Sequence, residues 1–163
     1  MPNSKISILL GSDHAGFVLK EEIKKNLKKN NTNLKDIGIY SYQYSDYPII
    51  AFELSKLVAK NNLNFNKKIK CFGILICGTG IGVSIVANKI PGIRAALCSN
   101  EYHAQMARKH NNANIICFGS KVTSVPDSIK MIKIFLETDF EGGRHEIRLK
   151  QIEKLNEPQE NLM

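Results

Sequence analysis

The chain lacks tryptophan entirely and has no apolar run long enough to span a membrane, although 43% of its 163 residues are hydrophobic. Its first apolar run, Ile6 to Gly11, ends in Ser12-Asp13-His14 and is too short to be the core of a signal peptide. Intrinsic disorder is also excluded, because only 23% of the residues are charged. We therefore expect a globular, cytoplasmic protein with no membrane partner.

Cysteine is scarce as well, and its spacing excludes the common Cys-x-x-Cys motifs. The four cysteines are Cys71, Cys77, Cys98 and Cys117. At least three of them lie within or at the end of apolar runs that are typical of buried strands. This usage favours a reduced protein over a disulfide framework.

Arginine is rare, even though the formal net charge is +8. Lysine supplies most of the positive charge, and its densest runs, 20–29 and 67–70, are typical of solvated surface. A nucleic-acid-binding face more often combines arginines with aromatic residues, which contact and stack on bases. We therefore expect no nucleic-acid partner, and a non-catalytic nucleic-acid or anion-binding protein stays as an alternative of another functional class.

Short apolar runs alternate with segments of helical periodicity, which predicts an α/β fold: a three-layer α/β/α sandwich with a five-stranded parallel sheet. The length suits one domain, which we place at 1–156 and follow with a polar tail at 157–163. A polar insertion is predicted at 61–70. The predicted strands cover 5–11, 34–38, 72–77, 94–98 and 114–118. Predicted helices begin near residues 17, 47, 101, 124 and 143.

In such a sheet, ligands bind at the carboxyl ends of the strands. The third predicted strand ends in Cys77-Gly78-Thr79-Gly80-Ile81-Gly82. Its glycines leave backbone amides uncovered just before a helix, an arrangement that holds an anion or a developing oxyanion. The alternative is a tight turn, but three glycines exceed what a turn needs. A dinucleotide-binding loop is disfavoured, because that motif reads G-x-G-x-x-G and follows the first strand.

Two groups of polar residues accompany this loop. Cys77 lies near a helix N-terminus, where the dipole favours a thiolate that can act as base or nucleophile; its alternative is a small buried strand residue. Asp13 and His14 follow the first strand and can bind a sugar hydroxyl or phosphate, or Asp13 can cap the next helix.

A further group lies in the last third of the chain. His110 ends a predicted helix and lies seven residues after His103, a spacing that does not match the helical metal pair. Arg144 and Arg148 are four residues apart, so both guanidinium groups can grip one phosphate from the same helix face. The alternative for the arginines is an exposed pair that bridges to nearby glutamates.

Together these motifs resemble the type B ribose-5-phosphate isomerases, in the family that includes galactose-6-phosphate isomerase. The resemblance covers nearly the whole chain. The motifs that carry it are Gly11-Ser12-Asp13-His14-Ala15-Gly16, Cys77-Gly78-Thr79-Gly80-Ile81-Gly82, His110-Asn111 and Glu141-Gly142-Gly143-Arg144-His145. It implies a Rossmann-like domain that forms a homodimer, in some members paired into tetramers, with active sites between subunits and no metal or organic cofactor.

The resemblance also implies a reaction and roles for these residues. The reaction interconverts ribose 5-phosphate and ribulose 5-phosphate through an enediolate, in the non-oxidative branch of the pentose phosphate pathway. Cys77 is then the base, and His110 of the partner opens the furanose ring with Thr79 nearby. The implied substrate-binding residues are Asp13, His14, Gly78, Gly80, Ile81, Gly82, Asn111, Lys121, Arg144 and Arg148.

The chain departs from the family pattern at a few positions. Val83 stands where some members place a catalytic glutamate, which assigns the chain to the cysteine branch. Lys121 replaces a common substrate-binding arginine, and a lysine contacts phosphate without the bidentate fork. Asn112 replaces the usual aspartate after His110-Asn111. A six-carbon sugar-phosphate isomerase of the same family stays as the second alternative.

Overall fold

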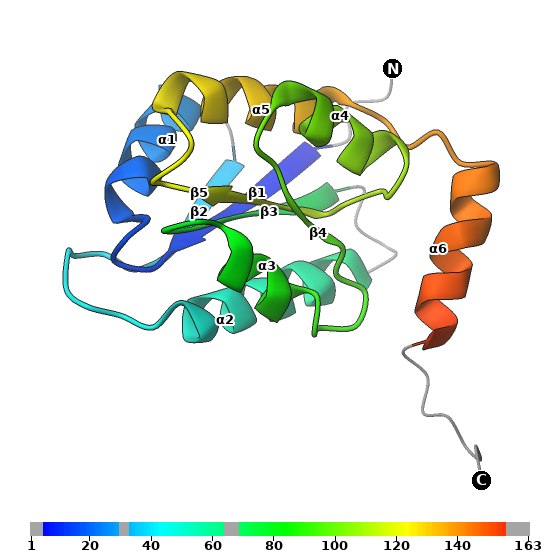
Figure 1. Cartoon of the computed structure of the whole chain (residues 1–163), viewed down its shortest axis with the longest axis horizontal. Coiled ribbons are helices and arrows are strands. Elements are labelled where there is room, and N and C mark those ends of the chain that lie inside the picture. The colour runs from blue at the N-terminus through cyan, green and yellow to red at the C-terminus, as the bar shows by residue number, and fades with distance from the viewer. Residues whose placement is uncertain (1–4, 30–32, 64–68, 156–163) are drawn as a thin grey trace, which may run out of the picture.

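The computed structural model describes residues 5–29, 33–63 and 69–155, in which five parallel strands form one sheet of order β2-β1-β3-β5-β4 (Figure 1). The strands are β1 (Lys5–Ser12), β2 (Asn33–Gly38), β3 (Ile69–Cys77), β4 (Ala95–Leu97) and β5 (Ile115–Gly119). The helices are α1 (Phe17–Lys29), α2 (Tyr47–Leu63), α3 (Ile81–Ala87), α4 (Glu101–Lys109), α5 (Val125–Glu137) and α6 (Arg144–Leu155). The predicted parallel α/β sandwich is confirmed.

Helices cover both faces of the sheet, with α1, α4 and α5 on one face and α2 and α3 on the other (Figure 1). Ile8 of β1 packs with Phe135 in one buried cluster, whereas its neighbour Leu9 packs with Leu54 in the other. This division follows from the strand geometry, because successive side chains point to opposite faces. Residues 71–77 of β3 are all buried, which explains why this strand is continuously apolar.

The structure differs from the sequence prediction in two places. The sequence predicts that Gly82 lies before the helix. In the structure α3 begins at Ile81, so Gly82 lies in its first turn. The predicted insertion at 61–70 is shorter than expected, because α2 continues to Leu63 and β3 begins at Ile69. Residues 64–68 and the tail at 157–163 lie outside the described residues, and the separate tail stays a prediction.

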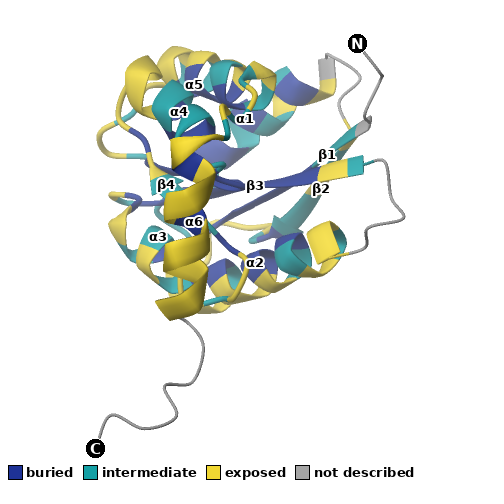
Figure 2. Ribbon diagram, turned by 90° about the vertical axis from the view of Figure 1, so that its right-hand side faces the viewer, coloured by how far each residue is buried: buried dark blue, intermediate teal, exposed yellow. Residues whose placement is uncertain are grey.

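Helix α6 projects away from the three layers and is exposed along most of its length (Figures 1 and 2). Only His145 and Leu149 of this helix are buried. The turn before it contains Gly142 and Gly143, whose φ angles of 68° and 56° strain any residue with a Cβ atom. Within the described ranges, the chain contains no helix that combines the length and the apolar character needed to cross a bilayer.

A fully buried lysine joins α1 to the chain that follows β2. Lys20 Nζ lies 2.8 Å from Asp36 Oδ2 and donates a hydrogen bond to the carbonyl of Ile39 at 2.7 Å. Burial acts to raise the pKa of Asp36, but hydrogen bonds from Lys20, Lys24 and the amide of Gly38 outweigh it, and the pKa is lowered. The pair thus anchors the start of a loop that reaches the candidate site.

Replacing Asp36 by asparagine removes one of the two carboxylates that pair with the buried ammonium of Lys20, and Glu21 Oε1 remains 2.9 Å from it. We expect Asp36→Asn to reduce the free energy of unfolding by about 2 kcal/mol at neutral pH, because it weakens charge-assisted hydrogen bonds without leaving Lys20 uncompensated. Because the pKa of Asp36 is lower in the folded state than in the unfolded state, its contribution is present above the unfolded value and is lost as the pH falls through the folded value. Urea unfolding measured from neutral to acidic pH should show the two proteins converging below about pH 4; a constant difference would contradict this.

Gly119 at the end of β5 lies directly behind the glycine loop. A Cβ atom added there would lie 2.6 Å from the backbone carbon and oxygen of Thr79. We expect Gly119→Ala to cost about 2 kcal/mol through overpacking, which lowers the Tm by about 4–8 °C. Thermal unfolding checks this, with Gly78→Ala as the matched control, because a Cβ atom at Gly78 meets nothing closer than 3.7 Å. An equal effect of both changes would refute the close-packing argument.

Candidate active site

Three loops meet at the carboxyl ends of β1, β3 and β5. After β1, the amide of Asp13 donates to the carbonyl of Ile76 in β3 at 3.3 Å. After β5, the amide of Lys121 donates to the carbonyl of Gly78 at 3.1 Å. Cys77, the last residue of β3, therefore lies between the other two loops. The structure thus brings together the two strand-end loops that the sequence predicts, after β1 and β3, and places Lys121 beside them.

Cys77 is buried, and its sulfur is held by the loop that follows it. The amide of Gly80 donates a hydrogen bond to Sγ at 3.1 Å. Gly80 has a φ of 78°, and a Cβ atom at this position would lie 2.6 Å from Leu97 Cδ1 and 2.7 Å from the backbone of Phe118. Glycine is therefore required at this position, both for the left-handed backbone and for the close approach to β5.

The other three cysteines differ from Cys77 in their surroundings. Burial raises the pKa of the Cys71 thiol and raises that of Cys98 to about 12. Burial also raises the pKa of Cys117 well above its ordinary value, and the neighbouring Cys98 and Cys77 add to the effect. These three residues remain protonated thiols near neutral pH, as expected of buried core residues.

The remaining residues of the glycine loop line the start of α3. The side chain of Thr79 is exposed, and its Oγ1 accepts a hydrogen bond from the amide of Ile81 at 3.4 Å. Helix α3 has no side-chain cap at its N-terminus, so the first-turn amides that follow Ile81 are available to a ligand. Tyr47, which the sequence analysis treated only as a helix start, forms one wall of the loop: a Cβ atom on Gly82 would lie 2.6 Å from its ring.

The loop after β1 is held by a segment that the sequence analysis did not select. Asp13 is buried, and its Oδ1 accepts from the amide of Gly16 at 2.9 Å. The capping alternative predicts a bond to the first turn of α1, but α1 begins at Phe17, so Asp13 closes the turn that precedes the helix and does not cap it. The His14 ring nitrogen Nδ1 lies 3.0 Å from the carbonyl of Ser45, and the ring centroid lies 4.8 Å from that of Tyr44. Tyr44 and Ser45 therefore fix the orientation of the His14 ring, although Ser45 follows His14 by 31 positions in the sequence.

The second group of predicted site residues lies at the opposite end of the sheet. Helix α4 packs over the sheet antiparallel to the strands, so its C-cap, His110, lies near the start of β5, whereas Cys77 pairs with Gly119 at the end of β5 (Figure 1). Five strand residues at about 3.3 Å each separate the two ends. The structure of one chain therefore does not bring Cys77 together with His110, Asn111, Arg144 and Arg148.

At this second location, His110 forms a compact cluster with residues that precede and begin α6. The rings of His110 and His145 are stacked, with centroids 4.1 Å apart and planes inclined by 7°. Glu141 Oε2 lies 3.9 Å from His110 Nε2 and 3.7 Å from His145 Nε2. Burial lowers the pKa of His145, and His110, Arg144 and Arg148 lower it further. Among the described residues, this is also the group whose donor atoms could hold a metal ion.

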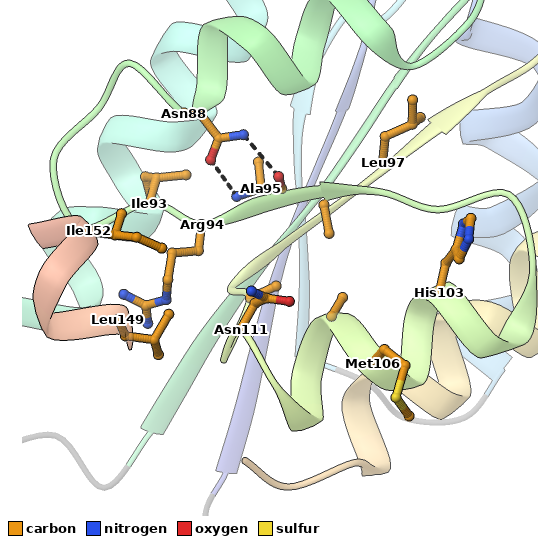
Figure 3. Close-up of a pocket in the computed structure, with 13 residues that line it drawn as sticks. Asn88, Ile93, Arg94, Ala95, Leu97, His103, Met106, Asn111, Leu149 and Ile152 are labelled. Carbon is orange, nitrogen blue, oxygen red and sulfur yellow. Dashed lines mark hydrogen bonds between the residues drawn. The ribbon is translucent and has the colours of Figure 1, made fainter. Parts of the chain in front are cut away.

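A groove of about 640 Å³ runs beside the edge strand β4, between α4 and α6 (Figure 3). Its lining includes Leu97, Met106, Asn111 and Ile152. The side chain of Asn88 covers part of the strand edge, because it bonds both the amide and the carbonyl of Ala95 (Figure 3). Large apolar side chains are exposed at or near this edge, namely Ile81, Ile85, Leu97 and Tyr102.

Comparison with known proteins agrees with this arrangement. The Ribose/Galactose Isomerase family profile matches residues 8–152. Ribose-5-phosphate isomerase B of Escherichia coli is 41% identical over 145 residues, which cover 89% of this chain and 93% of that protein. The probable ribose-5-phosphate isomerase B of Mycoplasma genitalium is 42% identical over 147 residues, covering 90% of this chain and 93% of that protein.

Solved structures extend the similarity to three dimensions. A crystal structure of ribose-5-phosphate isomerase B from Mycoplasma genitalium with bound ribulose-5-phosphate superposes with a TM-score of 0.86 at 40% identity, covering 94% of this chain and 97% of that one. The Clostridium thermocellum ribose-5-phosphate isomerase B superposes with a TM-score of 0.84 at 40% identity, covering 91% and 96% of the two chains. The chain therefore belongs to the ribose/galactose isomerase family.

Proposed function

We propose that this protein is a ribose-5-phosphate isomerase that interconverts ribose 5-phosphate and ribulose 5-phosphate. The observation that carries the proposal is the position of Cys77, whose sulfur accepts from the Gly80 amide where three strand-end loops meet. The similar Mycoplasma genitalium enzyme was solved with bound ribulose-5-phosphate. The unpaired cysteines suit the reducing cytoplasm, where we place the protein.

In this mechanism Cys77 moves one proton between two neighbouring carbons. Its thiolate takes the proton from C2 of the open-chain aldose, which leaves an enediolate, and returns it to C1. The hydroxyl proton moves from O2 to O1, so the reaction is a net isomerisation. Amides at the start of α3 stabilise the negative oxygen, while Thr79 lies beside them. A backbone donor on the sulfur suits a thiolate base.

We further propose that each active site is completed by a second copy of the chain. His110, Asn111, Arg144 and Arg148 lie at the far end of the sheet from Cys77 within one chain. The exposed apolar residues and the groove along β4 offer a surface that a second copy can cover. In the homodimer, His110 of one subunit opens the furanose ring, and the two arginines bind the phosphate, together with His14 and Lys121 of the other subunit.

The first test is an isomerase assay on ribose 5-phosphate with a chelator present. Wild type should produce ribulose 5-phosphate, and Cys77→Ala should reduce kcat by at least about a thousandfold, because the variant lacks the base. Cys71→Ala is the matched control, since its thiol is also buried but faces no loop of the site. Wild-type activity only on six-carbon sugar phosphates would favour the alternative substrate. Salt-sensitive nucleic-acid binding without isomerisation would favour the binding-protein alternative.

The second test asks whether the site is shared between subunits. Cys77→Ala and His110→Asn are each expected to be nearly inactive on ribose 5-phosphate. When the two chains are co-expressed, half of the random dimers are mixed, and each mixed dimer contains one site with both native residues. Activity should therefore return to about a quarter of the wild-type value. If the mixture stays as inactive as its parents, the shared site is wrong.

A further inference from the structure

Arg144 contacts the ring of His145. Its Nε, which can only donate, lies 3.4 Å from His145 Nε2. In this contact His145 Nε2 is the acceptor, which favours the neutral ring with its proton on Nδ1. The lowered pKa of His145, caused by burial and by the positive charges of His110, Arg144 and Arg148, agrees with this state.

Because His145 is neutral, His110 is the histidine that can form an ion pair with the carboxylate of Glu141. Glu141 Oε2 is 3.9 Å from His110 Nε2, and a neutral His145 has no proton at Nε2 to offer it. The backbone amide of Glu141 donates to the carbonyl of Lys109 at 3.0 Å, which fixes the residue beside the end of α4. Lys109 Nζ also lies 3.4 Å from this carboxylate, so the carboxylate is shared between one lysine and His110.

The stacked ring of His145 restricts the motion of His110. The two planes are nearly parallel, at 7°, and the ring of His145 is itself buried at the start of α6. Rotation of His110 about its Cβ bond would break this contact. His110 is only half-buried, and the stack is a steric restraint on its ring.

Metal binding is a weaker explanation for the same three residues. Two parallel rings cannot both direct the lone pairs of their Nε2 atoms, which lie in the ring planes, at one ion between them. Arg144 Nε already occupies His145 Nε2, and Lys109 and Arg148 add positive charge that repels a cation. The geometry therefore favours an arrangement that positions His110 and stabilises its protonated form.

We propose that Glu141 and His145 are positioning residues for His110: His145 holds the imidazole by stacking, and Glu141 stabilises its protonated form. The inference rests on the proposed function, because it concerns the step in which the furanose ring opens. His110 takes the proton of the O1 hydroxyl, the C1–O4 bond breaks as C1=O1 forms, and His110 returns the proton to O4. Between these transfers His110 is positively charged, and Glu141 offsets that charge.

A reaction that involves no ring separates this role from a structural one. Ribose 5-phosphate is largely a furanose, whereas ribulose 5-phosphate, whose O5 is esterified, cannot form one. Isomerisation therefore includes opening of the furanose in one direction and its closing in the other, and Glu141→Gln should reduce both kcat/KM values by the same factor, about tenfold, because their ratio is the equilibrium constant. Exchange of the C1 proton of ribulose 5-phosphate with solvent needs only Cys77, and its rate should change less than twofold.

Matched variants test each contact separately. Glu146→Gln removes an acidic group of α6 that pairs only with Lys150 among the described residues, and it should leave both directions unchanged. His145→Phe keeps an aromatic ring for the stack and should retain most of the ribose 5-phosphate activity, whereas His145→Ala should lose about tenfold. Equal losses of isomerisation and of C1 proton exchange in Glu141→Gln, or equal losses for the two His145 variants, would overturn the proposal.

An NMR titration of the His110 Cε1–H signal makes the test independent of the substrate. In Glu141→Gln the midpoint should move to lower pH relative to wild type, and in Glu146→Gln it should stay in place. Unfolding curves confirm that each variant is folded. If wild type isomerises neither sugar, the proposed function fails. The titration still decides whether Glu141 stabilises the protonated form of His110. An unmoved midpoint in Glu141→Gln would refute that contact.

Discussion

The parallel direction of all five strands is the constraint on which the site depends. It collects Cys77, Asp13, His14 and Lys121 at the carboxyl end of the sheet. It also forces every returning helix to end at the amino end, which is where α4 leaves His110. A sugar phosphate cannot contact both ends of one sheet, and the exposed edge at β4 and the projecting α6 are consistent with a protein completed by a second copy (Figure 2).

Close backbone packing connects the core to the chemistry. Gly80 and Gly119 let the glycine loop and β5 approach so closely that a Cβ atom on either would clash at 2.6 Å. That approach directs the Gly80 amide at Cys77 Sγ. The sulfur is therefore positioned by backbone atoms anchored to a central strand and not by a mobile side chain, which preserves its geometry when substrate binds.

The sequence predicts the strands and strand-end residues well, because buried strands are continuously apolar and parallel topology determines which ends meet. It predicts the start of α3 poorly, since Gly80 and Gly82 give no helical periodicity. It also misses Tyr44, Ser45 and Tyr47 around the site. Their proximity to His14 and Gly82 arises from tertiary packing, and only the density of tyrosines at 40–47 gave a local signal.

The four arginines of the chain all lie on segments near the amino end of the sheet: Arg94 precedes β4, Arg108 is in the last turn of α4, and Arg144 and Arg148 are in α6. Arg108 donates to the carbonyl of Ala113 at 2.7 Å and to Asn112 Oδ1 at 2.8 Å, and Arg94 donates to the carbonyl of Asn112 at 3.1 Å. Asn112 has a φ of 44°, a conformation that asparagine tolerates well. Its departure from the family's aspartate therefore preserves the turn: two arginines fix the segment that follows His110, while Arg144 and Arg148 begin the adjacent helix.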